Sequence, residues 1–286
     1  MRNSKDTAWL EAQYNNRARV PDYLDVFARW AKASALARSG SGSARIDVAY
    51  GAGAGETLDV FPAAQPDAPV LVFIHGGYWR RLDKAEHSFV APAFNARGAM
   101  VVVPNYALCP AVSVEHIALQ MAAMVTWVWR HAAQYGGNPA RIALVGHSAG
   151  GHLATMLLTC RWREVAEDLP AQPIAGALSI SGLYDMEPLR RTPSLQADLR
   201  FTPQAVARLS PAFFPRPKGS HLYAAVGLDE SDEFLRHNRL IRDVWGPTAV
   251  PVCETVPRAN HFSVLNSLVD PAGRLHQLAL RLLGLH

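Results

Sequence analysis

The chain has few of the features that mark secreted, membrane-spanning or nucleic-acid-binding proteins. Its 286 residues contain three cysteines, Cys109, Cys160 and Cys253, which are widely spaced and form no C-x-x-C pair. An odd number of distant cysteines predicts neither a disulfide framework nor a zinc knuckle. Charged residues interrupt the apolar content of residues 1–11. We therefore expect no signal peptide and a cytoplasmic protein.

Long apolar runs and a charge of one sign are also missing. No apolar run approaches the roughly 18 residues that cross a bilayer, so we expect no membrane partner. The net charge of +4 comes from arginines scattered among acids, as in residues 161–168. Because no basic stripe forms, nucleic acid is not an expected partner either. A hydrophobic content of 49% with 18% charged residues is typical of a globular domain.

One serine stands in a glycine-rich turn. Residues 146–150 read G-H-S-A-G, after the apolar residues 142–145 and before residues 151–159, whose composition is helical. This is the G-x-S-x-G pattern of a strand–turn–helix elbow, in which small neighbours leave the serine hydroxyl accessible above a sheet. The pattern predicts that Ser148 is a nucleophile for acyl transfer. The alternative is an ordinary glycine-rich turn, which the flanking strand and helix disfavour.

A second glycine-rich turn lies upstream. The apolar residues 69–74 end in residues 75–79, H-G-G-Y-W. Backbone N–H groups beside small residues can stabilise the negative charge that acyl transfer develops on the carbonyl oxygen. We expect the amides of Gly76, Gly77 and Ala149 to be those donors. Taken alone, H-G-G is equally typical of a plain turn at the end of a strand.

Candidate partners for the serine follow in the order acid, then histidine. An acidic loop with Asp229 and Glu230 comes after the apolar residues 222–226, and His261 comes after residues 250–256. Histidine can take and return a proton near neutral pH because its ordinary pKa is about 6.5. A carboxylate would orient the imidazole, and either acid can do so.

Apolar segments alternate with helical ones along the chain. Their continuous hydrophobicity predicts strands covered on both faces, in a doubly wound α/β sheet that begins with an antiparallel hairpin. Residues 113–135 predict an amphipathic helix, which Gly136 ends. The expected strands are residues 45–50 and 56–61 in the hairpin, then 70–74, 100–103, 142–145, 174–180, 222–226 and 250–256.

Two stretches do not follow this pattern. Residues 1–40 include a helix from about Asp22 to Arg38, with Leu24, Phe27, Ala31 and Ala35 on one face. This segment either packs on the edge of the domain or forms a lid over Ser148. Residues 183–217 are rich in proline and arginine and are a candidate second part of a cap. Residues 41–286 would then be the catalytic domain.

Residues 45–284 resemble the α/β-hydrolase superfamily, and within it the kynurenine formamidase (arylformamidase) branch, next to the hormone-sensitive-lipase-like esterases. The H-G-G-x-W form of residues 75–79 is the most selective feature. The other matching segments are residues 146–150, residues 181–188 (S-G-L-Y-D-M-E-P) and residues 260–265 (N-H-F-S-V-L). In this resemblance the acidic loop aligns on Glu233-Phe234 and places the acid at Glu230.

The resemblance implies a serine hydrolase without a cofactor that cleaves a small aryl formamide, similar to N-formylkynurenine, or a short acyl ester. We expect Tyr78, Trp79 and Tyr106 at the mouth of the substrate pocket, where their aromatic faces would suit a flat substrate. The alternative for each of them, packing in the core, is equally compatible with the sequence. A general carboxylesterase is the alternative activity, and a non-catalytic binding protein of this fold is a third hypothesis.

A metal site is not expected. His75, His147 and His152 are not accompanied by a carboxylate cluster or an H-E-x-x-H motif. The sequence leaves the oligomeric state open, a homodimer included.

Overall fold

The computed structural model describes residues 6–40, 42–53 and 55–285. Residues 1–5 of the segment considered for a signal peptide, Ser41 before the first strand and Ala54 in the expected hairpin turn lie outside the described residues. One sheet of eight strands forms the centre of the described chain. The strands are β1 Arg45–Ala49, β2 Thr57–Phe61, β3 Ala68–Ile74, β4 Met100–Pro104, β5 Gly137–His147, β6 Ile174–Ile180, β7 His221–Gly227 and β8 Val252–Val256.

The strands run in the order β1-β2-β4-β3-β5-β6-β7-β8. β1 pairs with β2 and β2 with β4 in antiparallel register, while every later pair is parallel. The expected fold class is therefore confirmed, including the antiparallel hairpin at its start. The chain leaves β3 toward β4 and then returns to the other side of β3 as β5, so β3 and β5 meet where the winding direction reverses.

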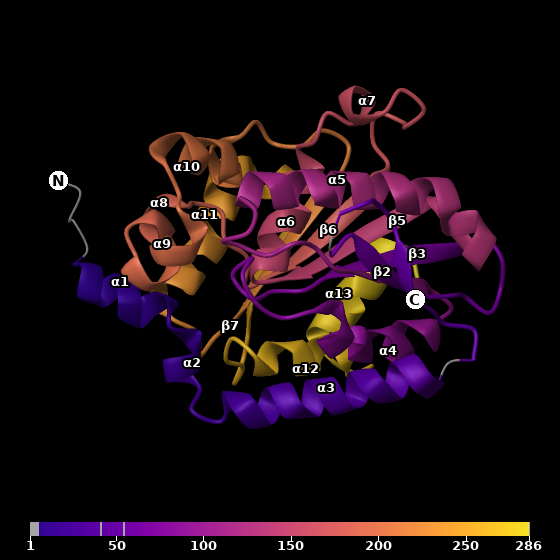
Figure 1. The fold of residues 1–286 in the computed structure, drawn as a ribbon, viewed down its shortest axis with the longest axis horizontal. Helices are drawn as coiled ribbons and strands as arrows, with labels where there is room; N and C mark the ends of the chain where they lie inside the picture. The colour runs from indigo at the N-terminus through magenta and orange to yellow at the C-terminus, as the bar shows by residue number, and fades with distance from the viewer. Residues whose placement is uncertain (1–5, 41, 54, 286) are drawn as a thin grey trace.

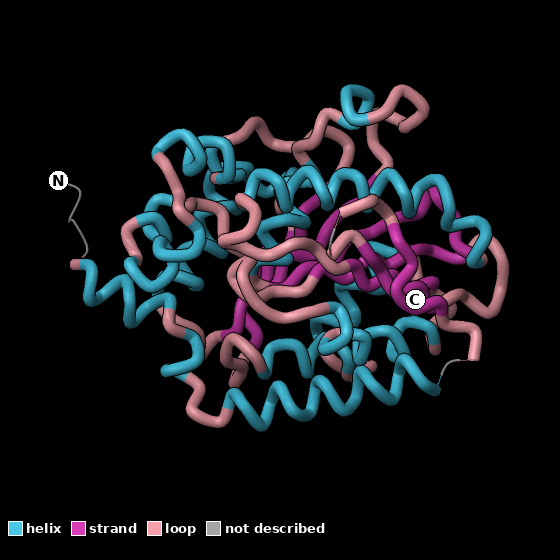
Figure 2. The backbone as a smooth tube through the Cα atoms, viewed as in Figure 1, coloured by secondary structure: helices cyan, strands magenta, loops and turns pink. Residues whose placement is uncertain are grey.

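Helices cover both faces of the sheet, as Figures 1 and 2 show. The helix expected over residues 113–135 is confirmed as α5 followed by a 3-10 turn, and Gly136 ends it in the left-handed conformation. The helices are α1 Thr7–Tyr14, α2 Asn16–Arg19, α3 Tyr23–Gly40, α4 Ala91–Asn95, α5 Val114–His131, α6 Ala149–Leu158, α7 Trp162–Val165, α8 Glu187–Arg190, α9 Pro193–Leu199, α10 Pro203–Leu209, α11 Asp232–Ala249, α12 Asn266–Val269 and α13 Arg274–Leu283. Short 3-10 helices are η1 Lys84–Glu86, η2 Ser88–Val90, η3 Ala132–Tyr135, η4 Pro211–Phe213 and η5 Ser263–Leu265.

β3 is apolar along its whole length because its side chains enter two different cores. Val70 and Val72 pack with α5 and α6 on one face of the sheet. Leu71 and Phe73 pack with α3, α4 and α13 on the other. Alternate residues of a strand point to opposite faces, so a strand covered on both sides needs apolar residues at every position.

The apolar face that Leu24, Phe27, Ala31 and Ala35 share is not the face of α3 that enters the core, although Phe27 is half-buried and lines the pocket. Val26, Trp30, Ser34 and Ala37 face the core, whereas Leu24 is 65% exposed and Ala31 and Ala35 are also exposed. Apolar residues occur on several sides of this helix, so periodicity alone did not select the face. The contacts of η2 with α3 decide it, because the hydroxyl of Ser34 accepts a hydrogen bond from the Phe89 amide at 3.1 Å.

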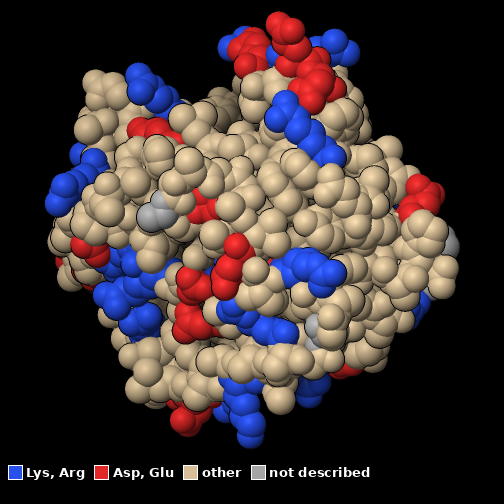
Figure 3. All heavy atoms as spheres, turned by 45° about the vertical axis from the view of Figure 1, so that its right-hand side comes forward, with Lys and Arg blue, Asp and Glu red and all other residues tan. Residues whose placement is uncertain are grey.

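No helix in the described part of the chain is long and apolar enough to cross a membrane. On the face drawn in Figure 3, basic and acidic side chains lie in small groups of both signs.

Candidate active site

Ser148 occupies a sharp turn between β5 and α6. Its backbone has φ 57° and ψ −116°, a conformation that side-chain-bearing residues rarely adopt, and its N–H donates to the Ile180 carbonyl at 2.8 Å. A Cβ at Gly146 would collide with the backbone of Gly150, and one at Gly150 would collide with the Ile74 carbonyl. The two glycines thus allow the turn to lie directly against β3. Ser148 therefore lies between β3 and β5, where the winding direction of the chain reverses.

His261 lies between Ser148 and Glu230. Its Nε2 is 3.1 Å from the Ser148 hydroxyl, and its Nδ1 is 2.6 Å from Oε2 of Glu230. A carboxylate can only accept, so Nδ1 carries the proton and Nε2 offers its lone pair to the serine hydroxyl. The Phe234 ring packs beside the imidazole, with 4.5 Å between ring centroids. This arrangement can remove the serine proton and return it to a leaving group.

Of the two neighbouring acids, the structure brings Glu230 to His261. Its other carboxylate oxygen accepts hydrogen bonds from the Ser181 hydroxyl at 2.5 Å and the Gly227 amide at 2.8 Å. These two hydrogen bonds replace the hydrogen bonds to water that the carboxylate loses when it is buried. The side chain of Asp229 is exposed instead.

His147, next to the serine, supports the loop that carries His261. Its Nε2 donates to the His261 carbonyl oxygen at 2.8 Å. Burial lowers the pKa of His147 well below its ordinary value, and the charge that His261 can carry lowers it further. A neutral His147 can make this single donation without placing a second positive charge beside His261.

The other two histidines considered as metal ligands also make unrelated hydrogen bonds. His75 contacts the Asn105 side chain, and His152 donates to the Leu209 carbonyl. Within the described residues no group of three or more histidine, cysteine, aspartate or glutamate side chains could hold a metal ion.

The turn after β3 has a left-handed backbone. Gly77 (φ 107°), Tyr78 (φ 52°) and Trp79 (φ 56°) follow one another, and the Arg80 amide closes the turn on the Gly77 carbonyl at 3.1 Å. Gly77 and Tyr78 line the pocket that contains Ser148, whereas Gly76 does not. Ala149 is the first residue of α6, where a backbone N–H has no partner within the helix.

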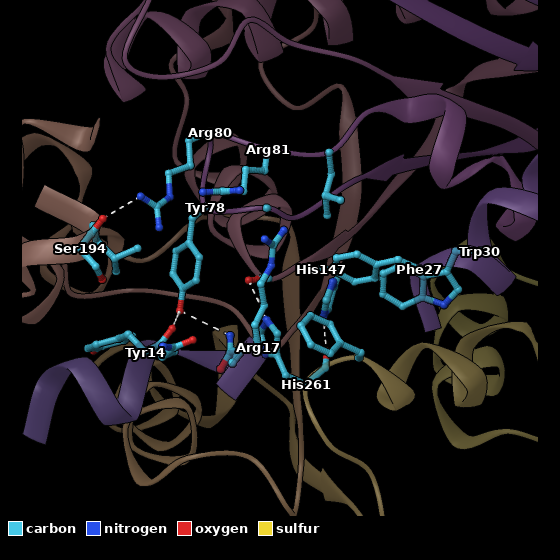
Figure 4. Close-up of a pocket in the computed structure, with 17 residues that line it drawn as sticks. Tyr14, Arg17, Phe27, Trp30, Tyr78, Arg80, Arg81, His147, Ser194 and His261 are labelled. Carbon is cyan, nitrogen blue, oxygen red and sulfur yellow. Dashed lines mark hydrogen bonds between the residues drawn. The ribbon is translucent and has the colours of Figure 1, made fainter. Parts of the chain in front are cut away.

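Ser148 and His261 open into a pocket of about 240 Å³. Much of its wall comes from the N-terminal segment and from α9, as Figure 4 shows. The N-terminal segment supplies Tyr14, Asn15, Asn16, Arg17, Phe27 and Trp30, and the rest of the wall is Gly77, Tyr78, Arg80, Arg81, Leu82, His147, Ser194, Leu195 and Phe262.

Two of the three aromatic residues expected at the pocket mouth do not lie there. Tyr78 lines the pocket, but Trp79 and Tyr106 are buried in the core, so the pocket expectation is wrong for both and the packing alternative holds. The left-handed turn directs the Trp79 ring away from the pocket, against His152 with 5.0 Å between centroids. The Tyr106 hydroxyl instead donates to the His75 carbonyl at 2.9 Å, which holds the strand end.

Several pocket residues had no signal in the sequence. Arg17 and Trp30 belong to the N-terminal segment, far along the chain from Ser148, and Arg81 follows the H-G-G-Y-W turn. Phe262 of the pocket, and Ser181, which donates to Glu230, could have been predicted, because both belong to segments that carry the family resemblance.

Comparisons with known proteins agree with this architecture. The family described as alpha/beta hydrolase fold matches residues 71–240. The chain belongs to this family. Among its relatives, this α/β hydrolase is 32% identical to the kynurenine formamidase of Danio rerio, covering 98% of this chain and 97% of the relative. It is 29% identical to the kynurenine formamidase of Salmo salar, covering 96% and 93%.

A solved structure is also similar over nearly the whole chain. This α/β hydrolase superimposes with a TM-score of 0.83 on a candidate thioesterase from Silicibacter sp. TM1040, with 30% identity over 94% of this chain and 98% of the other. By family and homology the chain is a hydrolase, and the family implies a small-molecule substrate.

Proposed function

We propose that the protein is a serine hydrolase that cleaves a small aryl formamide. The observation that carries this proposal is the hydrogen-bonded series from Ser148 through His261 to Glu230, at 3.1 and 2.6 Å, at the base of a pocket with aromatic walls. The similarity to proteins named kynurenine formamidase supports the choice of substrate.

In this mechanism the Ser148 hydroxyl attacks the formyl carbon while His261 takes its proton at Nε2. Glu230 holds the imidazole in the required tautomer and stabilises the imidazolium. His261 then protonates the departing aryl amine, which leaves Ser148 as a formyl ester. A water molecule, deprotonated by His261, cleaves the ester and releases formate.

Backbone amides would stabilise the oxyanion. Gly77 and Ala149 remain our candidates, since Gly77 lines the pocket and Ala149 begins α6. Gly76 is a candidate too, because a Cβ built on it would lie 3.1 Å from the Cβ of Ser148, and the amide of Tyr78, next in the left-handed turn, is a further one. Loss of one such donor typically costs about 10²–10³ in rate.

Residues 1–40 act as a lid in this proposal, and residues 183–217 as a smaller cap, over the catalytic domain of residues 41–286. α1 meets α9 where the Glu11 carboxylate accepts from the amide and hydroxyl of Ser194, at 2.7 and 2.6 Å. The two segments thereby close one side of the pocket. The protein would act in the cytoplasm without a cofactor.

The test compares kcat/KM for N-formyl-L-kynurenine with kcat/KM for p-nitrophenyl acetate and butyrate. Formyl is the smallest acyl group, so a crowded pocket should favour it by several decades over butyrate. Ser148→Ala, with an unchanged thermal unfolding curve, should abolish turnover and labelling by a serine-directed organophosphate. Efficient hydrolysis of butyrate esters with no turnover of the formamide would instead favour a general carboxylesterase.

A further inference from the structure

The end of α1 docks on the first turn of α11, a helix far along the chain that begins just after Glu230. Gln13 and Tyr14 are both buried there. The side-chain oxygen of Gln13 accepts a hydrogen bond from the Glu233 amide at 3.2 Å. The Tyr14 hydroxyl donates to the Glu233 carboxylate at 2.9 Å. Two neighbouring residues of the N-terminal segment therefore bind one residue of α11.

Gln13 supplies a cap that α11 does not obtain from its own N-cap residue. The amides in the first turn of a helix have no partner within the helix, and a serine at the N-cap commonly provides one. Ser231 occupies the N-cap of α11, but its side chain makes no capping hydrogen bond and its hydroxyl has no partner among the described residues. The Gln13 oxygen takes this role instead, and removal of the N-terminal segment would take this acceptor away from the helix.

The hydrogen bonds around Tyr14 can run in one direction only. The Tyr184 amide donates to Nδ1 of His237 at 3.0 Å, so this nitrogen carries a lone pair and the imidazole proton is on Nε2. Nε2 donates to the Tyr14 oxygen at 3.0 Å, and the Tyr14 hydroxyl in turn donates to Glu233. Arg236 binds the same carboxylate at 3.0 Å. Burial and the charge of Glu233 raise the pKa of Tyr14 well above its ordinary value, so the hydroxyl keeps the proton that it donates.

The first turn of α11 also contacts the acid–histidine pair of the site. The Phe234 ring packs against the Tyr14 ring, with 6.0 Å between centroids, and against the His261 imidazole, with 4.5 Å. Glu230, which binds His261 at 2.6 Å, immediately precedes the N-cap residue of this helix. A shift of the turn would therefore move both the carboxylate and the ring that pack against His261.

We propose that Gln13 and Tyr14 are positioning residues, which couple docking of the N-terminal segment to the alignment of Glu230 and His261. This inference rests on the proposed function, because it assumes that these two residues activate Ser148. With the segment docked, the first turn of α11 is capped and the acid–histidine pair is held in place. The segment then controls how fast the serine reacts, in addition to covering the pocket.

The experiment measures the rate at which Ser148 reacts with diisopropyl fluorophosphate, a small reagent that requires an activated serine. Tyr14→Phe keeps the ring but removes the donor to Glu233, and Gln13→Met keeps the length of the side chain but removes the acceptor. We expect each variant to lower the labelling rate constant, and kcat for p-nitrophenyl acetate, about tenfold with little change in KM. The matched control is Tyr135→Phe, in η3 and outside the pocket, which should react at the wild-type rate.

Hydrogen exchange and NMR measure the coupling without a substrate. In Gln13→Met the amides of residues 232–235 should exchange faster, whereas those of residues 238–245, in the middle of the same helix, should keep their wild-type rates. In both variants the resonance of the Nδ1 proton between His261 and Glu230 should broaden, because this proton would exchange faster with water. A segment that only covers the pocket would change neither observable.

Labelling of both variants at the wild-type rate, with a change in KM or substrate range alone, would overturn the coupling. Equally faster exchange along the whole of α11 would also overturn it, since that result indicates general destabilisation of the helix. No labelling of the wild-type protein would contradict the proposed function. The exchange rates and the His261 resonance would then still decide whether the N-terminal segment positions the acid–histidine pair.

Discussion

The Tyr78 hydroxyl donates to the backbone carbonyl of Tyr14 at 2.8 Å. This hydrogen bond joins the turn beside Ser148 to the end of α1. The Asn16 side chain also reaches the Tyr78 hydroxyl, at 3.4 Å. The N-terminal segment therefore contacts the turn that carries candidate oxyanion donors, and does more than cover the edge of the sheet.

Removing the Tyr78 hydroxyl should loosen this connection. We expect Tyr78→Phe to reduce kcat/KM about tenfold, since a lost hydrogen bond contributes about 1 kcal/mol and the turn would be less well positioned. Tyr135→Phe, outside the pocket, is the matched control. Steady-state kinetics and thermal unfolding of both variants would check this, and identical kinetics for the two would contradict the positioning role.

Two truncations compare the first part of the N-terminal lid, which lines the pocket, with α3, which also packs on the catalytic domain. Deletion of residues 1–21 removes Tyr14, Asn16 and Arg17 from the pocket wall but keeps α3. We expect KM to rise and the range of accepted substrates to widen. Deletion of residues 1–40 should also lower the melting temperature strongly, because Val26 and Trp30 are buried against the domain. If the shorter deletion lowers the melting temperature but leaves kcat/KM and the range of accepted substrates unchanged, residues 1–21 have a purely structural role.

The two neighbouring acids should differ sharply when their charges are removed. Glu230→Gln should lower kcat by up to about 10⁴, because the amide disturbs the tautomer of His261. Asp229→Asn should stay close to wild type, since its side chain is exposed. Asp185, which lies 3.4 Å from Arg236 in an ion pair, is a further control as Asp185→Asn. Similar, mild losses for Glu230→Gln and Asp229→Asn would exclude Glu230 as the acid.

The buried histidines should make the fold sensitive to acid. Burial lowers the pKa of His152 from 6.5 to about 4. Below pH 6.5 the unfolded chain binds a proton that the folded protein does not, so this histidine's contribution to stability is complete above pH 6.5 and is lost as the pH falls toward 4. The loss amounts to about 2 kcal/mol between pH 7 and pH 5.

His152→Gln keeps an amide that can donate to Leu209 but cannot titrate. Its free energy of unfolding, measured by urea denaturation, should fall less between pH 7 and pH 5 than that of wild type. His116→Gln, on the exposed side of α5, should retain the wild-type slope. The same slope in all three proteins would mean that His152 titrates normally.

Much of the fold could be predicted because its determinants are local. The strands are continuous apolar runs, and the elbow at Ser148 depends on glycines directly beside it in the chain. The sequence also predicts the turn after β3, but not its handedness. That handedness decides that Tyr78 faces the pocket and Trp79 the core.

The sequence by itself determined the order of the candidate catalytic residues along the chain. A serine follows one strand, the acids follow a later strand and a histidine follows the last. Tertiary structure decided which side chains meet. Glu230 faces His261 because the loop folds back on Gly227 and Ala259, and the face of α3 follows from its contacts with η2. Arg17 and Arg81 share a pocket with Ser148 because the N-terminal segment packs against the turn after β3. Local patterns specify such elements, but contacts between distant segments depend on packing free energy summed over the whole chain, which no short window of sequence contains.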